Sequence, residues 1–281
     1  MAEFVYPPVI NAAKGYFAAI GVKVTEVGGE HIPRTGGAVL ASNHVSYLDF
    51  MFCGLAAQPS KRLVRFMAKK SVFDHRISGP LMRGMKHIPV DRVAGAGAYS
   101  AAVKSLRDGE IVGVFPEATV SRSFLLKDFK NGAARMAAEA GVPLVPMILW
   151  GTQRYWSKEN PRQLTRRNNP VQLRVGEPLH PTLDDDAGEV TEEMKSRMAV
   201  LLDEAIEADT YRSTGPDDLW WLPAPRGGTA PTPEDAAVLE KAEVEERIAE
   251  AKAKIRAEAL ARVQARNKAK AKAEAKGKPK T

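Results

Sequence analysis

The sequence predicts an α/β fold, in which a mostly parallel sheet is flanked by helices, on the strength of two observations. Short apolar segments of strand length alternate along the chain with longer segments whose apolar residues recur at helical spacing. The composition is that of a globular protein, because 44% of the 281 residues are apolar and 27% are charged. A chain of this size can bury a sizeable core.

Each element follows from a local pattern. Apolar runs predict strands over residues 39–41, 63–68, 87–90, 111–115 and 144–149, and alternation of apolar residues predicts a half-exposed strand over 171–175. Helical spacing predicts helices over 46–57, 71–85, 99–107, 129–140 and 190–206. Gly109 and Gly141 follow two of these helices, where helices commonly end.

The start of the chain, residues 1–30, predicts an amphipathic helix with apolar residues and two lysines, Lys14 and Lys23. Two interpretations are open: a helix lying in a membrane interface, or a helix that caps the core. Its prolines and lysines make it too polar for a transmembrane segment, and no secretory signal is recognised.

The charge of the chain is concentrated at its end. Residues 234–250 hold seven acidic and two basic residues, and residues 251–281 hold eleven basic and two acidic residues. Their net charges of −5 and +9 leave +3 of the total +7 for residues 1–233. We therefore expect an α/β domain over 31–222, a Pro/Gly linker over 223–233, and a helix-prone or disordered charged tail over 234–281.

The single cysteine, Cys53, cannot form an intramolecular disulfide, which favours a reducing, intracellular compartment. We expect Cys53 to be a packing residue, because it lies among apolar residues of a predicted helix. The positive net charge favours polyanionic partners, whether phosphorylated substrates, anionic lipid headgroups or nucleic acid.

A polar cluster, residues 42–49, begins where the first core strand is expected to end. Ligands of α/β sheets gather beyond the carboxyl ends of the strands. His44 can take up a proton near neutral pH, and Asp49 can hold its ring one helical turn away. The competing interpretation is a capping box, in which Ser46 is the N-cap, Asp49 is the third helical residue and His44 is only a turn residue.

Two further clusters follow later strands. Residues 115–122 place Glu117, Thr119 and Ser121 at the same expected sheet edge, so that two polar clusters suggest one cleft. Residues 87–92 place Arg92 after a short strand, where its guanidinium group can bind a phosphate or form an ordinary salt bridge with Asp91. Neither a Walker loop nor metal-ligand spacing is present, and no metal is expected.

Together, four ordered segments resemble the 1-acyl-glycerol-3-phosphate acyltransferase family, the lysophosphatidate acyltransferase type of glycerophospholipid acyltransferase. The first block of the family, His followed by four residues and Asp (HX4D), is similar to His44 through Asp49. The later blocks are similar to residues 88–92, 115–121 and 142–146, so that the resemblance covers about residues 35–180.

The resemblance implies the roles of the site residues. His44 would be the general base and Asp49 would orient it. The substrate-binding residues would be Asn43, Ser46, Arg92, Glu117, Thr119, Ser121, Arg122 and Lys130. The third block usually reads Glu-Gly-Thr-Arg-Ser, but Ala118 here replaces the glycine and Val120 the arginine. Arg122, Lys127 or Lys130 can substitute for the missing cation, or the acceptor is another lysophospholipid or a glycolipid.

The expected reaction moves a fatty acyl group from acyl-CoA, or from acyl carrier protein, to a free hydroxyl of lysophosphatidate or a related lysophospholipid. The sn-2 hydroxyl is the favoured acceptor position, and no cofactor is expected. Because no nucleophile motif occurs, direct transfer is favoured over an acyl-enzyme. We expect a peripheral protein that binds the anionic surface at the cytoplasmic face of the cell membrane. Nucleic acid is not an expected partner. The alternatives are a thioesterase, and an adaptor without catalysis whose basic tail binds nucleic acid or membranes.

Overall fold

The structure, a computed structural model, describes residues 4–91 and 95–276. The chain divides into two compact units, Met1–Ala230 and Pro231–Thr281. The boundary falls inside the stretch 223–233 that the composition marks as a linker. Residues 223–230 belong to the first unit, in which the amide of Ala230 donates to the carbonyl oxygen of Leu222.

The described strands of the first unit form one seven-stranded sheet in the order β1-β7-β6-β2-β5-β3-β4. The strands are β1 (Lys23–Val27), β2 (Ala38–Ser42), β3 (Val64–Lys69), β4 (Ile88–Val90), β5 (Ile111–Val114), β6 (Leu144–Trp150) and β7 (Pro170–Val175). All neighbouring pairs are parallel except β6 and β7. The predicted α/β class with a mostly parallel sheet is therefore confirmed.

The helices of the first unit lie close to the ranges that helical spacing predicts. They are α1 (Tyr6–Ala19), α2 (Asp49–Ala56), α3 (Lys70–Asp74), α4 (Ser78–Gly84), α5 (Gly95–Arg107), α6 (Gly132–Ala140) and α7 (Ala187–Glu207), with short 3-10 turns η1 (Gly29–His31), η2 (Thr152–Arg154), η3 (Pro216–Asp218) and η4 (Ala224–Arg226). The single helix expected over 71–85 is two short helices, α3 and α4, because the chain leaves the helical conformation at His75, whose backbone is extended.

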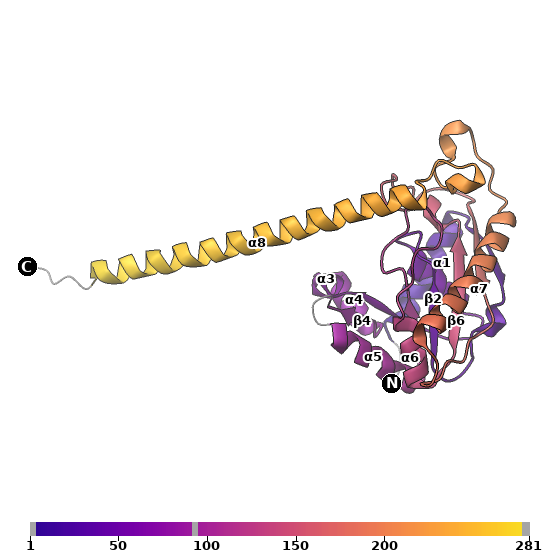
Figure 1. Ribbon diagram of the computed structural model, residues 1–281, viewed down its shortest axis with the longest axis horizontal. Coiled ribbons are helices and arrows are strands. Elements are labelled where there is room, and N and C mark those ends of the chain that lie inside the picture. The colour runs from indigo at the N-terminus through magenta and orange to yellow at the C-terminus, as the bar shows by residue number, and fades with distance from the viewer. Residues whose placement is uncertain (1–3, 92–94, 277–281) are drawn as a thin grey trace, which may run out of the picture. The chain divides into compact units, whose positions relative to one another are not determined.

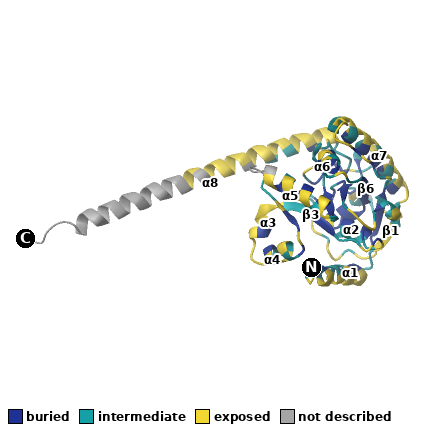
Figure 2. Ribbon diagram, turned by 90° about the horizontal axis from the view of Figure 1, so that it is seen from below, coloured by how far each residue is buried: buried dark blue, intermediate teal, exposed yellow. Residues whose placement is uncertain are grey.

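Helices lie against both faces of the sheet (Figure 1). The sheet separates two apolar clusters. Alternate residues of a strand point to opposite faces, so Val39 and Ala41 of β2 join one cluster, and Ala38 and Leu40 join the other. Helices α5, α6 and α7 cover the first cluster, and α1 and α2 cover the second. In Figure 2 the strands between these layers are mostly dark blue. Strands buried on both faces explain why the sequence shows continuous apolar runs.

The expectations for β1 and β7 need correction. The sequence predicts no strand before residue 39, yet β1 pairs in parallel with β7, Lys23 lying opposite Pro170. Most residues of β1 are exposed, and its polar residues hide the strand from a hydrophobic pattern. Strand β7 was expected to be half-exposed, but it lies between β1 and β6 and all its residues except Arg174 are buried.

Helix α1 packs against the second apolar cluster. Phe17 stacks on Phe52 of α2 with ring centroids 4.5 Å apart, and the Tyr6 hydroxyl donates to the carbonyl oxygen of Val64 over 2.6 Å. The rest of the helix is largely exposed. Its contacts are those of a helix that caps the sheet, and its length is 14 residues within the 30 that the sequence assigns to it.

In the second unit the described residues form a single helix of 44 residues, α8 (Pro233–Lys276). Its first turn carries Glu234 and Asp235, where negative charge stabilises a helix. The large apolar residues of its first half, Val238 and Ile248 among them, are exposed. Among the helices that the structure describes, none has both the length and the apolar content needed to cross a membrane.

Candidate active site

The polar segments predicted to share a cleft do meet at one edge of the sheet. Strands β2, β5 and β6 are parallel neighbours, so their carboxyl ends lie side by side. His44 follows β2, Glu117 follows β5, and Thr152 follows β6. Side chains from segments more than 100 residues apart in sequence therefore surround one point.

His44 and Asp49 form a hydrogen-bonded pair at this edge. His44 Nδ1 lies 2.9 Å from Asp49 Oδ2. Because a carboxylate only accepts, the shared hydrogen is assigned to Nδ1, which leaves Nε2 with the lone pair of the ring. The Asp49 side chain is fully buried, whereas 19% of the His44 side chain is exposed. The pair thus presents a basic Nε2 on a ring whose other nitrogen is bonded to a buried carboxylate.

Both carboxylate oxygens of Asp49 are occupied. Oδ2 also accepts from the backbone amides of Val45 and Ser46, each over 2.8 Å. Oδ1 accepts from the hydroxyl of Thr152, which is fully buried, over 2.6 Å. The competing capping box, with Ser46 as N-cap and Asp49 as third helical residue, is not formed, because α2 begins at Asp49 itself and its N-cap, Leu48, makes no side-chain capping bond. Asp49 Oδ2 instead joins the turn before α2 to the histidine. Four hydrogen bonds thus fix the position of this carboxylate.

The third block holds the backbone of His44 from both sides. Glu117 Oε1 accepts from the His44 amide over 2.9 Å, and the Ser121 amide donates to the His44 carbonyl oxygen over 2.7 Å. Burial raises the pKa of Glu117 to about 8, although the bond from the His44 amide and the charge of Lys127 act in the opposite direction. Glu117 is therefore largely protonated at neutral pH and adds little negative charge beside the pair.

The His44 ring lies flat against an aromatic side chain. Its centroid is 4.2 Å from that of Phe115, with 19° between the planes, and Phe66 stacks beyond Phe115 at 6.2 Å. Gly113 in β5 makes room for this arrangement, because a Cβ there would lie 2.5 Å from the Phe66 ring. Backbone bonds, a carboxylate and a ring face together fix the orientation of His44.

Several residues expected to bind substrate lie in the interior and bond to the protein. Both polar atoms of the Asn43 amide bond to the backbone of Leu149, and the Ser46 hydroxyl donates to the carbonyl oxygen of Trp156. The Ser121 hydroxyl donates to the carbonyl oxygen of Leu125. These three side chains are at most 1% exposed. Their contacts join the loops of the site to one another.

The remaining cations expected in the site differ in their surroundings. Arg122 is buried, and its Nε donates to Glu159 Oε1 over 2.8 Å. Lys130 is exposed. Lys127, half-buried, donates from Nζ to Thr119 Oγ1 over 2.6 Å, and its charge acts on Glu117. Arg92 lies outside the residues that the structure describes.

The two departures in the third block have different structural consequences. Ala118 has φ +61°, a left-handed conformation in which a glycine avoids the steric penalty of a Cβ. The glycine usual in the family therefore suits a turn that this chain forms with alanine. Val120 is buried at 2% exposure, so the side chain that replaces the usual arginine contributes to packing.

Burial confirms that Cys53 is a packing residue and shows where the large aromatic rings near the site lie. Cys53 is 1% exposed, and burial raises the pKa of its thiol. A buried, protonated thiol is unreactive, as expected for a packing residue. Trp150, Tyr155 and Trp221 are buried too, so their rings pack inside the first unit. Thr152 belongs to no sequence motif, and only its place directly after β6 could have indicated its role.

The chain is similar in sequence to known proteins. The sequence model of the Acyltransferase family matches residues 23–150, which include His44, Asp49 and the third block. The 1-acyl-sn-glycerol-3-phosphate acyltransferase of Bacillus subtilis (strain 168) is 31% identical over 161 residues, 57% of this chain and 74% of that protein. The enzyme of that name from Limnanthes douglasii is 34% identical over 159 residues, so that the match spans 55% of this chain and 53% of that protein.

A solved structure shares the fold. The crystal structure of the 1-acyl-sn-glycerophosphate (LPA) acyltransferase PlsC from Thermotoga maritima superposes with a TM-score of 0.61 at 22% identity, covering 73% of this chain and 81% of that chain.

The fold and the family match define the class of protein: it is an acyltransferase. More narrowly, the chain belongs to the 1-acyl-sn-glycerol-3-phosphate acyltransferase family. The resemblance seen in the four sequence blocks is thereby confirmed.

Proposed function

We propose that the protein transfers a fatty acyl group from acyl-CoA to the sn-2 hydroxyl of 1-acyl-sn-glycerol-3-phosphate, with His44 as the general base and without a cofactor. The names of the relatives support the acceptor. The observation that carries the proposal is the bond between His44 Nδ1 and Asp49 Oδ2, because it leaves a basic Nε2 on a partly exposed ring.

The chemistry requires His44 to accept a proton from the acceptor hydroxyl and then to donate it to the leaving sulfur. The acceptor hydroxyl oxygen attacks the thioester carbonyl carbon while Nε2 removes its proton. Asp49 stabilises the imidazolium ion through its bond to Nδ1, and three further hydrogen bonds hold its carboxylate in place. The tetrahedral intermediate then expels the thiolate as the carbon–sulfur bond breaks, and the imidazolium returns the proton to sulfur. A thioester is already activated, so no metal is needed for this step.

The phosphate of the acceptor needs a cation, which the third block lacks at Val120. We assign this role to Lys127, with Thr119 beside it, because Lys127 is half-buried and its charge acts on Glu117 at the site. Arg122 is less suited because it is buried in an ion pair with Glu159. Glu117 and Ser121 hold the backbone of His44, and Arg92 keeps the phosphate-binding role that the family resemblance implies.

The acceptor and the product are bilayer lipids, so the reaction has to take place at a membrane surface. We place the protein at the cytoplasmic face of the cell membrane as a peripheral protein. The basic second half of α8, with nine basic and two acidic residues over 251–276, supplies charge for an anionic surface.

The test of the function is an acyl-transfer assay with purified protein. Labelled acyl-CoA, or acylated carrier protein, is supplied with a panel of lysolipids, and the products are resolved by position. We expect phosphatidate formed by acylation at sn-2. Release of free fatty acid without an acylated lipid would indicate a thioesterase, and transfer only to another lysolipid or a glycolipid would correct the acceptor.

Thr152 offers a prediction about positioning. Replacing it by valine keeps the volume but removes the donor to Asp49 Oδ1, which leaves a buried carboxylate oxygen without that bond. We expect kcat to fall about 10-fold to 100-fold, the loss typical of outer residues that orient a metal-bound histidine, while KM stays close to the wild type. Steady-state kinetics with both substrates measures the two parameters separately.

The matched control is Thr152→Ser, which restores a hydroxyl at the same position and should recover most of the lost kcat. Equal losses in the valine and serine variants would refute the role of the hydroxyl, and a rise in KM alone would assign Thr152 to substrate binding.

A further inference from the structure

Two short helices after β3 leave apolar side chains uncovered. The α3–α4 hairpin, residues 70–84, exposes Val72, Ile77 and Leu81 at 38%, 72% and 42%. Figure 2 shows both helices mainly in yellow, standing out from the body of the unit. Exposed single apolar residues are ordinary, but three on one small hairpin form a patch.

The hairpin is well anchored, so this exposure is a property of an ordered element. Phe73 is buried at 5%, and the Ser78 hydroxyl donates to the carbonyl oxygen of Val72 over 2.7 Å. Arg83 Nη1 donates to the carbonyl oxygen of Phe73 over 2.7 Å. Gly79 packs so closely that a Cβ there would lie 2.2 Å from the Phe73 oxygen.

Positive charge surrounds the apolar patch. Residues 69–86 contain five basic residues and one acidic residue, Asp74. Lys69, Lys70, Arg76 and Arg83 are exposed, and Lys70 Nζ lies 3.6 Å from Asp91 Oδ2. Apolar side chains among cations match the boundary between the headgroups and acyl chains of an anionic bilayer.

The hairpin begins at the sheet edge where His44 lies. Strand β3 runs parallel to β5, and β5 runs parallel to β2, so the carboxyl ends of all three lie together. Parallel neighbours are about 4.8 Å apart, which puts β3 roughly 10 Å from β2. Tyr47 and Phe50, beside the catalytic pair in sequence, are also exposed, at 40% and 44%.

We propose that the α3–α4 hairpin is the surface by which this acyltransferase docks on an anionic phospholipid bilayer, with Ile77 and Leu81 entering the acyl boundary and Lys69 and Arg76 facing lipid phosphates. This inference rests on the proposed function in one respect: docking here brings a bilayer-embedded acceptor to the edge that holds His44.

The experiment measures binding and activity separately with the full chain. Binding is measured by co-sedimentation with vesicles of phosphatidylcholine alone, or of phosphatidylcholine and phosphatidylglycerol in equal amounts. Activity is measured with a long-chain acceptor in the mixed vesicles and with a short-chain acceptor dissolved as monomers. The variants are Ile77→Asp with Leu81→Asp, and Lys69→Glu with Arg76→Glu. The control is Leu183→Asp with Val200→Asp, residues 78% and 58% exposed elsewhere on the unit.

We expect the Ile77/Leu81 variant to bind both kinds of vesicle at least about tenfold more weakly and to lose activity on the embedded acceptor in proportion. The charge variant should lose binding only to the mixed vesicles, and added salt should weaken the wild type there. Both variants should keep wild-type activity on the dissolved acceptor, which also shows that they fold. The control should bind like the wild type.

Unchanged vesicle binding in the Ile77/Leu81 variant, or an equal loss in the control, would overturn the proposal. A wild type that binds neither kind of vesicle would do the same, and would leave the patch to a protein partner. If the wild type fails to acylate even the dissolved acceptor, the proposed function fails, but the sedimentation result still decides whether the hairpin docks on lipid.

Discussion

The His44→Ala variant is expected to fold like the wild type and to transfer acyl groups about 10³ to 10⁴ times more slowly. An alcohol is almost wholly protonated at neutral pH, so attack on a thioester is slow unless a base removes its proton in the transition state. His44 Nε2 is the nitrogen that the Asp49 hydrogen bond leaves free for this task. The measurement is kcat with acyl-CoA and the lysophosphatidate acceptor.

The fold should survive because the variant leaves no buried group without a partner. Asp49 keeps the amides of Val45 and Ser46 and the hydroxyl of Thr152, and the alanine backbone keeps its bonds to Glu117 and Ser121. Thermal unfolding of the variant checks this point. The control, His180→Ala, removes an exposed histidine outside the site and should leave kcat unchanged. Near-normal transfer by the His44 variant would end its assignment as the base.

The sequence predicts the catalytic pair because the two residues lie close together in the chain. His44 and Asp49 are five residues apart, so the end of β2 and the start of α2 bring them together without the rest of the fold. The spacing did not reveal that the oxygen of Asp49 that holds the ring also accepts from the amides of Val45 and Ser46, in the turn before α2. It did not reveal Thr152 either, which lies 103 residues further on and reaches Asp49 only because β6 pairs with β2.

The order of the strands also depends on contacts between residues that are far apart in the sequence. Alternation of strands and helices predicts a parallel sheet, yet β1 joins the sheet through β7, whose partner residues lie far along the chain. A five-residue strand with mostly exposed side chains has no apolar pattern of its own. The roles of Glu117 and Ser121 were also beyond prediction, since the polar side chains after a strand can face a substrate or the next loop. Here one of them accepts from the backbone of His44.

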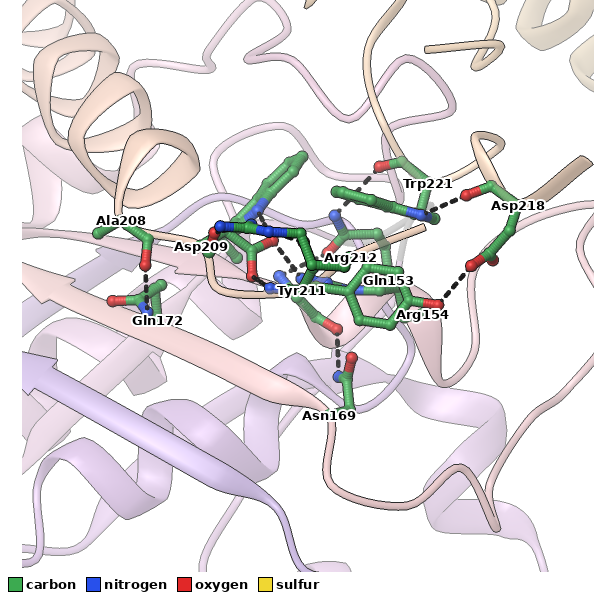
Figure 3. Close-up of polar contacts among 12 residues, drawn as sticks. Gln153, Arg154, Asn169, Gln172, Ala208, Asp209, Tyr211, Arg212, Asp218 and Trp221 are labelled. Atoms are coloured by element: carbon green, nitrogen blue, oxygen red, sulfur yellow. Dashed lines mark hydrogen bonds and ion pairs between the residues drawn. The ribbon is translucent and has the colours of Figure 1, made fainter. Parts of the chain in front are cut away.

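Asp209→Asn is expected to lower the free energy of unfolding of the first unit by about 3 kcal/mol, because it leaves a buried arginine without its counter-charge. The Arg154 side chain is fully buried and that of Asp209 is 5% exposed. Arg154 Nη2 donates to Asp209 Oδ2 over 2.6 Å, and the indole of Trp150 donates to the same oxygen. Figure 3 shows this cluster, with Arg154 among aromatic and polar side chains.

The aromatic neighbours reduce the expected loss but do not remove it. The guanidinium carbon of Arg154 lies 4.4 Å from the ring centroid of Tyr211 and 4.5 Å from that of Trp221. Such faces stabilise a desolvated cation by about 2 kcal/mol or more. Burial nevertheless lowers the pKa of Arg154 to about 10 even with Asp209 present, so the site already disfavours the charge. Asparagine retains the shape, but its NH2 group replaces one of two accepting oxygens, since Oδ2 accepts from Trp150 and Arg154 and Oδ1 from the Tyr211 amide. The expected loss therefore includes one acceptor as well as the charge.

Urea unfolding measures the effect, and an exposed ion pair provides the comparison. Glu193 and Arg197 lie one turn apart on α7, with side chains 55% and 39% exposed, so Glu193→Gln should cost less than about 0.5 kcal/mol. If Asp209→Asn costs no more than this control, the aromatic faces alone hold the Arg154 charge. A large loss would instead make the ion pair the contact that fixes the segment after α7 to η2. Because η2 also carries Thr152, that contact would then support the residue that bonds to Asp49.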